Sequence, residues 1–160
     1  MVVLLTAVAY DRNLEIGHPN GVRAGVVSAS GNEASASAAR ELVDAIRSRI
    51  TMKVKGLPLY VEAIEASAAT GLGQQLAERG VNLLFLAPGL DGTIVAALQQ
   101  YAKQQRCLMV SNDSAYLGSG LAIAVVLNGD RPKLVIDLEA AQEQGADFPG
   151  TLLQLAELRR

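Results

Sequence analysis

Residues 81–86 read Val-Asn-Leu-Leu-Phe-Leu, a nearly continuous apolar run that is followed closely by the breaker pair Pro88-Gly89. A run of this length, with little alternation of polar residues, is typical of a parallel strand that is covered on both faces. Such a strand needs helices packed above and below its sheet. The run therefore predicts a central strand of an α/β fold.

The segments before and after this run alternate between strand and helix patterns. In residues 32–50, Ala39, Val43 and Ile46 recur at helical spacing, and charged residues fall mostly between the apolar ones. Short β-rich runs bounded by glycine or proline predict strands. The expected strands are Val22–Ser28, Leu57–Ile64, Val81–Leu86 and Cys107–Val110, and the expected helices are Asn32–Ile50, Thr70–Arg79 and Thr93–Gln104. This alternation implies right-handed crossovers and a largely parallel sheet.

The final third of the chain does not continue this alternation of strands and helices. Two β-rich runs, Gly120–Leu127 and Lys133–Leu138, flank Asn128-Gly129, and Asn-Gly between such runs is a strong hairpin signal. An antiparallel hairpin is therefore expected at the edge of the sheet. Two short helices are expected after it, Glu139–Gln144 and Thr151–Leu158, the second with an apolar stripe of Leu152, Leu155 and Ala156. The fold class predicted is α/β, a three-layer, Rossmann-like, mostly parallel sheet with a C-terminal antiparallel hairpin and a helical tail.

Size and composition restrict the class of protein. A chain of 160 residues that is 50% hydrophobic has the size of one domain, so residues 1–160 are expected to form a single α/β domain. The 14 basic and 16 acidic residues are scattered, so no basic face is available for a row of phosphates. Aromatic residues make up 4% of the chain, which argues against a surface that stacks on bases. Nucleic acid is therefore not an expected partner.

No catalytic or metal-binding constellation is visible in the sequence. Cys107 is the single cysteine and His18 the single histidine, so the chain lacks the usual zinc ligands and cannot form an internal disulfide. Cys107 opens an apolar run and is expected to be a buried small hydrophobe. His18 stands in a predicted turn, with no acid or nucleophile beside it in sequence to form a catalytic pair. We expect no enzyme activity, no cofactor and no metal ion.

Polar loops follow three of the predicted strands, at the carboxyl edge where open α/β sheets usually bind ligands. No loop has the spaced glycines of a dinucleotide site or the Gly-Lys-Ser/Thr ending of a P-loop. In a plain structural interpretation, which capping preferences favour, polar side chains such as Asn32, Asp91 and Asp113 only cap the helices that follow. Ser30 and Asn112 are alternative caps. The candidate binding residues of these loops are Ser28, Ser30, Gly31, Asn32, Pro88, Gly89, Asn112 and Asp113.

The beginning of the chain is apolar and allows two interpretations. Residues 1–9 are either the remainder of a signal peptide or a first buried helix that continues into residues 10–14. The stretch is too short to span a bilayer. Tyr10, Arg12 and Asn13 concentrate hydrogen-bonding side chains where it ends. That cluster is either a solvated helix end, which is the commoner case, or a corner that binds a partner.

An ordered set of short motifs runs through the closing third. The strand at residues 120–127 is followed by Ile136-Asp137-Leu138, Ala140-Ala141, Gly145 and the tail Gly150-Thr-Leu-Leu-Gln-Leu-Ala156. Upstream, Tyr10-Asp-Arg-Asn-Leu14 and Lys55-Gly-Leu-Pro-Leu59 fit the same pattern. In this order the motifs resemble the YfiR-like family of secreted bacterial proteins.

The resemblance implies a periplasmic α/β protein, its leader presumed removed, whose relatives restrain a membrane-bound diguanylate cyclase by binding its periplasmic sensor region. It thus implies regulation in a cyclic-di-GMP pathway through protein-protein contact, without catalysis. Members are often dimeric, so a homodimer stays open as a partner, and so does a small ligand. The best-known members use disulfides, whereas the lone Cys107 permits none within this chain.

Three functions compete on these observations. The first is a periplasmic regulatory protein that binds the sensor region of a membrane signalling enzyme. The second is a small-ligand-binding protein that resembles one lobe of a solute-binding protein, with its site in loops 28–32, 88–90 and 111–113. The third is an enzyme of the flavodoxin-like or Rossmann-like class, which is the least favoured because a fold by itself implies no chemistry.

Overall fold

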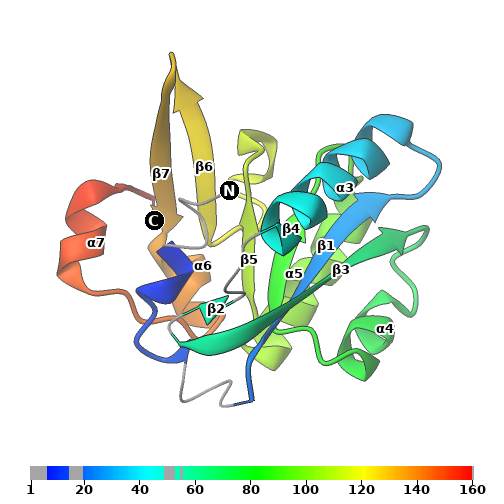
Figure 1. The fold of residues 1–160 in the computed structure, drawn as a ribbon, viewed down its shortest axis with the longest axis horizontal. Coiled ribbons are helices and arrows are strands. Elements are labelled where there is room, and N and C mark those ends of the chain that lie inside the picture. The colour runs from blue at the N-terminus through cyan, green and yellow to red at the C-terminus, as the bar shows by residue number, and fades with distance from the viewer. Residues whose placement is uncertain (1–6, 15–19, 49–52, 55, 160) are drawn as a thin grey trace.

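The apolar run at residues 81–86 contains strand β4 (Leu83–Leu86), which lies in the middle of a mixed sheet (Figure 1). The computed structural model describes residues 7–14, 20–48, 53–54 and 56–159. Within these residues the sheet has eight strands in the order β2-β3-β1-β4-β5-β6-β7-β8. The other strands are β1 (Val22–Ala29), β2 (Lys53–Val54), β3 (Leu57–Ala66), β5 (Leu108–Ser111), β6 (Ile123–Asn128), β7 (Arg131–Asp137) and β8 (Glu157–Arg159).

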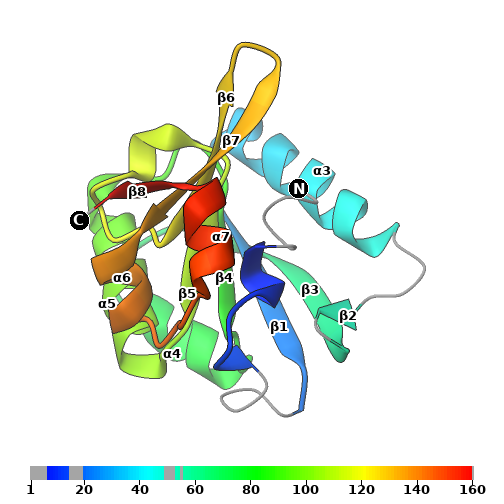
Figure 2. The same cartoon turned by 90° about the vertical axis from the view of Figure 1, so that its left-hand side faces the viewer.

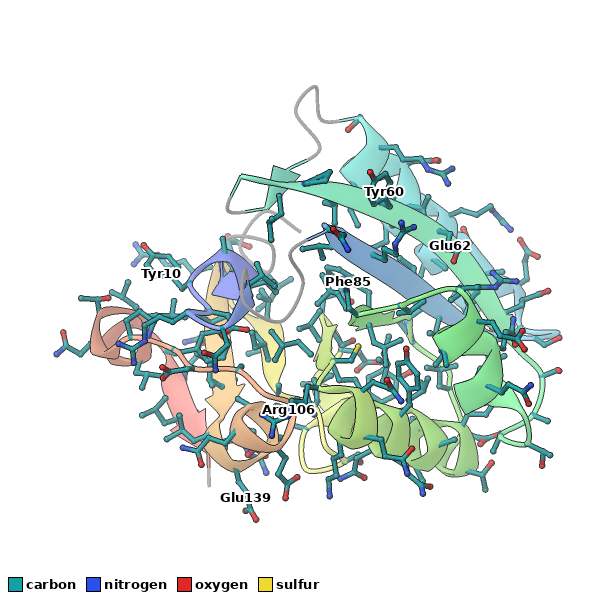
Figure 3. The ribbon with its side chains drawn as sticks, turned by 90° about the horizontal axis from the view of Figure 1, so that it is seen from below. Tyr10, Tyr60, Glu62, Phe85, Arg106 and Glu139 are labelled. Carbon is teal, nitrogen blue, oxygen red and sulfur yellow. The ribbon has the colours of Figure 1, made fainter. Side chains whose placement is uncertain are left out.

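Helices cover both faces of this sheet. One apolar core joins residues 7–14, α3 and the C-terminal helices to the sheet, and a second core joins α4, α5 and η1 to the opposite face. Phe85 belongs to the first core and its neighbours in β4 to the second, because successive side chains of a strand point to opposite faces (Figure 3). The helices are α3 (Glu33–Arg47), α4 (Leu72–Glu78), α5 (Gly92–Gln105), α6 (Leu138–Glu143), α7 (Gly150–Leu155) and the 3-10 helix η1 (Ser114–Tyr116). The predicted three-layer, Rossmann-like arrangement is confirmed.

Strand directions also agree with the prediction. β3, β1, β4, β5 and β6 are parallel neighbours in that order. β6 and β7 form the predicted antiparallel hairpin, in register from Ile123 opposite Ile136 to Asn128 opposite Arg131. Its turn contains Gly129 at a φ of 67°, a conformation that favours glycine. The hairpin projects beyond the rest of the sheet (Figures 1 and 2).

The end of the chain differs from the prediction. The helix predicted over Thr151–Leu158 ends at Leu155, and residues 157–159 form β8, which pairs in parallel with β7. The hairpin is therefore not the edge of the sheet, and Leu155, expected in an apolar stripe, is 80% exposed. A short helix gains little stability by itself, whereas the edge of β7 offers backbone groups that need hydrogen-bond partners. Strand pairing therefore prevails at residues 157–159.

Smaller differences concern the first half of the chain. β2, which has two residues and pairs antiparallel with Leu57–Pro58, has no counterpart among the predicted elements. Residues 7–9 are helical, and Ala7 and Val8 lie in the core, so the described part of the N-terminal stretch is a buried helix. Residues 1–6, the turn that contains His18, and Ile50 at the end of the predicted helix lie outside the described residues.

Candidate functional site

Two of the predicted binding loops meet where the strand order reverses. β1 has β3 on one side and β4 on the other, and this arrangement leaves a crevice outside the carboxyl ends of β1 and β4. Loop 28–32 follows β1, and Pro88-Gly89 follows β4. A Cβ atom at Gly89 would lie 2.7 Å from Asn32 Nδ2, so the two loops are in contact. The candidate residues of loop 28–32 and of Pro88-Gly89 therefore lie together at one edge of the sheet.

Hydrogen bonds within the first loop hold its backbone in place. Asn32 Oδ1 accepts from the Ser35 amide at 3.1 Å and caps α3, as the structural interpretation proposed. Ser35 Oγ accepts from the Ala29 amide at 2.8 Å, and the Ser30 amide donates to the Ala66 carbonyl at 3.0 Å. Ser28 is buried, whereas Ser30 and Gly31 are exposed at the turn. The exposed part of this loop is therefore presented on a rigid frame.

The loop after β5 lies on the same edge. Ser111 Oγ donates to the Leu86 carbonyl at 2.7 Å and accepts from the Asp113 amide at 3.0 Å, which links the ends of β4 and β5. Asp113 caps η1 by accepting from the Ala115 amide at 2.9 Å. Asn112 lines a hollow of about 190 Å³ together with Pro88 and residues of α3. All three predicted loops therefore reach the carboxyl edge.

Asp91 is the N-cap of α5, also as the structural interpretation proposed. Its Oδ1 accepts from Thr93 Oγ1 at 2.6 Å and from the Ile94 amide at 2.9 Å. These hydrogen bonds favour the carboxylate form and lower the pKa of Asp91. Asp91 thus stabilises the helix that follows the Pro88-Gly89 turn.

Tyr116 is the residue at this edge that the sequence-based reasoning missed. Its hydroxyl donates to the Ala87 carbonyl at 2.5 Å and accepts from the Leu90 amide at 3.1 Å, so one buried side chain holds both ends of the Pro88-Gly89 turn. Burial raises the pKa of Tyr116. The available signal was a tyrosine among apolar and small residues in a chain with few aromatics.

The other predicted candidates lie at the opposite end of the sheet. Arg12 forms two hydrogen bonds with the Asp147 carboxylate, Nε to Oδ2 at 3.0 Å and Nη2 to Oδ1 at 2.8 Å. Asn13 Nδ2 donates to the Gly145 carbonyl at 3.1 Å. Both side chains therefore attach the N-terminal segment to the loop that follows α6. Sequence reasoning named Arg12 and Asn13 together but did not identify the residues that they contact.

Residues 10–13 form the N-terminal corner, and the buried side chain of Asp11 holds its backbone in place. Asp11 is only 5% exposed, and its Oδ1 accepts from the amides of Asn13 and Asp147, each at 2.9 Å. Asp11 itself is therefore not solvated, whereas Tyr10, Arg12 and Asn13 are exposed. Tyr10 is 43% exposed and lies on the outer side of the N-terminal segment (Figure 3).

A cavity of about 510 Å³ lies behind this corner, at the amino ends of β4 and β5. Its volume falls in the range of small-molecule sites. Arg106 ends α5 in the left-handed conformation, with a φ of 50°, and packs against Gly145, where a Cβ atom would lie 2.9 Å from Arg106 Cβ. The polar lining is rich in amides and comprises Asp11, Asn13, Asn82, Gln104, Gln105, Arg106 and Gln144.

Part of this lining serves the fold. Gln144 Oε1 accepts from the Met109 amide at 2.9 Å, and its Nε2 donates to the Gly120 carbonyl at 2.6 Å. Asn82 Oδ1 accepts from the Arg23 amide at 2.7 Å. No local sequence pattern indicated the cavity, because its polar lining residues come from four separate parts of the chain.

Side chains that could ligate a metal ion do not come together in the described part of the chain. These residues contain no group of three or more histidine, cysteine, aspartate or glutamate side chains arranged to hold a metal ion. Cys107 is fully buried, as predicted, and burial raises the pKa of its thiol. None of the helices in the described ranges combines the length and apolar character that crossing a membrane requires.

The sequence of residues 31–157 matches the YfiR/HmsC-like family, so the match covers most of the strands and helices described above. The chain belongs to the YfiR/HmsC-like family. No curated protein matches its sequence. Family membership supports the predicted class of periplasmic regulator and identifies no partner.

Solved structures share the fold at low sequence identity. A conserved domain protein from Vibrio cholerae aligns with a TM-score of 0.62 at 18% identity, over 92% of this chain and 57% of its own. The ABC domain in complex with L-Trp from Streptococcus pneumonia gives 0.61 at 13%, over 96% and 62%. A ligand-free, open substrate-binding protein with adhesive properties from Clostridium difficile gives 0.66 at 10%, over 92% and 57%. The chain thus spans about three fifths of the length of these structures.

Proposed function

We propose that this protein is a periplasmic regulator that restrains a membrane-bound signalling enzyme, a diguanylate cyclase or an enzyme of similar type, by binding its periplasmic sensor region. The observation that carries this proposal is the family match over residues 31–157. An envelope signal that weakens the contact would release the enzyme. In this proposal the protein acts by binding and is not an enzyme.

The N-terminal corner is the proposed contact surface. Tyrosine and arginine are enriched among the residues that contribute most to protein interfaces. Here the exposed ring of Tyr10 precedes Arg12, whose guanidinium is already oriented by Asp147. Asp11 holds the backbone on either side of Arg12 by accepting from the Asn13 amide, and Asn13 donates to the Gly145 carbonyl. A corner that is ordered before binding loses less conformational entropy when a partner docks.

Cross-linking in envelope extracts tests this proposal. We expect the wild-type protein to recover a membrane signalling enzyme, and Tyr10→Ser to recover less of it. Tyr60→Ser is the matched control, because Tyr60 is 49% exposed but lies on β3, where its ring stacks on Arg23 at 4.8 Å. Recovery of no membrane signalling protein by the wild type would contradict the proposed function. Equal loss in both variants would contradict the assignment of the corner.

A small-ligand-binding protein is the second candidate, and the likeness to the substrate-binding protein from Clostridium difficile favours it. The chain covers 57% of the length of that substrate-binding protein, and another matched structure holds L-Trp. A ligand that binds only the native state must raise its apparent stability. A thermal-shift screen of metabolites, amino acids included, is expected to give a hit if this candidate is correct. Asn112→Ala and Arg106→Gln would then show whether the carboxyl-edge hollow or the 510 Å³ cavity binds it.

A further inference from the structure

The cavity of about 510 Å³ at the amino ends of β4 and β5 has both an apolar and a polar lining. Its apolar side chains belong to the first core, and its polar ones come mainly from the ends of α5 and α6 and from the N-terminal corner. The apolar members are Val8, Leu14, Leu83 and Leu108, and each is buried. Small-molecule sites typically combine such apolar side chains with a few polar groups. A ligand that fits this lining therefore has an apolar portion and a few polar atoms.

Arg106 is the one cation among the described residues that line the cavity. It lies where the ends of α5 and α6 approach each other (Figure 3), and a salt bridge of 3.2 Å between Lys103 and Glu143 joins the same two helices. Its side chain packs along Gly145, because a Cβ atom at Gly145 would lie 2.9 Å from Arg106 Cβ and 3.2 Å from Arg106 Cδ. A side chain at position 145 would therefore displace Arg106.

The backbone of Arg106 adopts a conformation that arginine rarely takes. Among the described residues other than glycine, it alone has a positive φ, of 50°. Helices often end in this conformation, but glycine usually supplies it, because a side chain makes it costly. Within the described structure the guanidinium forms no ion pair or side-chain hydrogen bond, whereas Arg12 and Arg79 each pair with a carboxylate. Glycine would end the helix with less strain, and no salt bridge among these residues needs the arginine.

The other charges around the cavity restrict the kind of anion that it accepts. Asp11 belongs to the lining, and α5 and α6 end there at Arg106 and Gln144, so their terminal carbonyl groups add partial negative charge. A single guanidinium balances one negative charge and binds a carboxylate through two parallel hydrogen bonds. A phosphate dianion would be repelled by the negative charge that remains.

We propose that this cavity binds a small organic monocarboxylate. The carboxylate pairs with Arg106, and the apolar portion of the ligand contacts Leu83 and Leu108. This inference rests on the second candidate function, ligand binding, and does not depend on the regulatory one.

Thermal-shift and calorimetric titrations of the full chain test the site with benzoate, hexanoate and mandelate. The neutral amides of these acids lack the charge, and phenyl phosphate is mostly a dianion at neutral pH, so both serve as comparison probes. Arg106→Gln removes the charge and keeps a side chain at the strained position. Arg131→Gln is the matched control, because Arg131 is an exposed arginine at the start of β7, in the hairpin that projects beyond the sheet.

We expect at least one of the three acids to raise the melting temperature of the wild type more than its amide does. Arg106→Gln should raise the dissociation constant of that acid about tenfold or more, since a charge-assisted pair is lost. Arg131→Gln should leave the constant unchanged. Phenyl phosphate should bind more weakly than benzoate.

Arg106→Gly separates binding from stability. Glycine adopts a positive φ without strain, so this variant should melt at or above the wild-type temperature without ligand, yet bind the acids as weakly as Arg106→Gln. Asn112→Ala, at the carboxyl edge, should bind them normally. No shift with any of the three acids, or binding that survives the loss of the Arg106 side chain, would overturn the monocarboxylate site. Hits from other metabolites alone would overturn this site and still support a ligand-binding function, so the two failures are distinguishable.

Discussion

Replacing Tyr116 by phenylalanine removes a single hydroxyl and keeps the packing of the ring. That hydroxyl serves two backbone groups, the Ala87 carbonyl and the Leu90 amide, and both hydrogen bonds are buried. Leaving a buried backbone group without its partner costs about 1–3 kcal/mol. For two groups we expect the free energy of unfolding to fall by about 3 kcal/mol. At about 3 °C per kcal/mol for a domain of this size, the melting temperature should fall by about 9 °C.

Tyr101→Phe is the matched control for this measurement. Its hydroxyl is also buried but donates one hydrogen bond, to the Val81 carbonyl at 2.5 Å. We expect a loss of about 1.5 kcal/mol, half that of Tyr116→Phe, because one backbone group loses its partner instead of two. Urea unfolding followed by far-UV circular dichroism measures both. A loss from Tyr116→Phe no greater than that from Tyr101→Phe would refute the role of Tyr116 in holding the turn.

Three further predictions concern the edge loops and the core. Gly89→Ala should destabilise the protein by about 1 kcal/mol more than Gly31→Ala in urea unfolding, because both have positive φ but only Gly89 would displace the capping side chain of Asn32. Equal losses would contradict this. Burial, and secondarily Cys107, raises the pKa of Tyr101 to about 12, so the unfolded chain ionises first and stability should fall as the pH rises from about 10 to about 12. Tyr101→Phe should remove that part of the fall. The native Cys107 thiol, buried and with a raised pKa, should resist a thiol reagent at neutral pH until urea unfolds the chain. Rapid labelling of the native protein would show that the core opens readily.

Local patterns in the sequence determined most of the fold. Strand β4 and helix α3 follow from apolar runs and helical periodicity, which depend on neighbours a few residues away. The same holds for Asn32, Asp91 and Asp113, because each caps a helix that begins at the next residue. The position of the three polar loops also followed from the sequence, since parallel strands place their carboxyl ends at one edge.

Contacts between distant residues were decided only by the tertiary structure. Arg12 and Asp147 are 135 positions apart, and Tyr116 is 29 positions from the Ala87 carbonyl, so no local pattern marks either pair. The amide-lined cavity likewise combines separate parts of the chain. Residues 157–159 have a sequence that fits the end of a helix, yet they form a strand because β7 supplies hydrogen-bond partners. Helix and strand propensity depends on residues that are neighbours in the sequence, whereas backbone pairing and burial depend on residues that only the fold brings together. At residues 157–159, pairing with β7 outweighed the helical pattern.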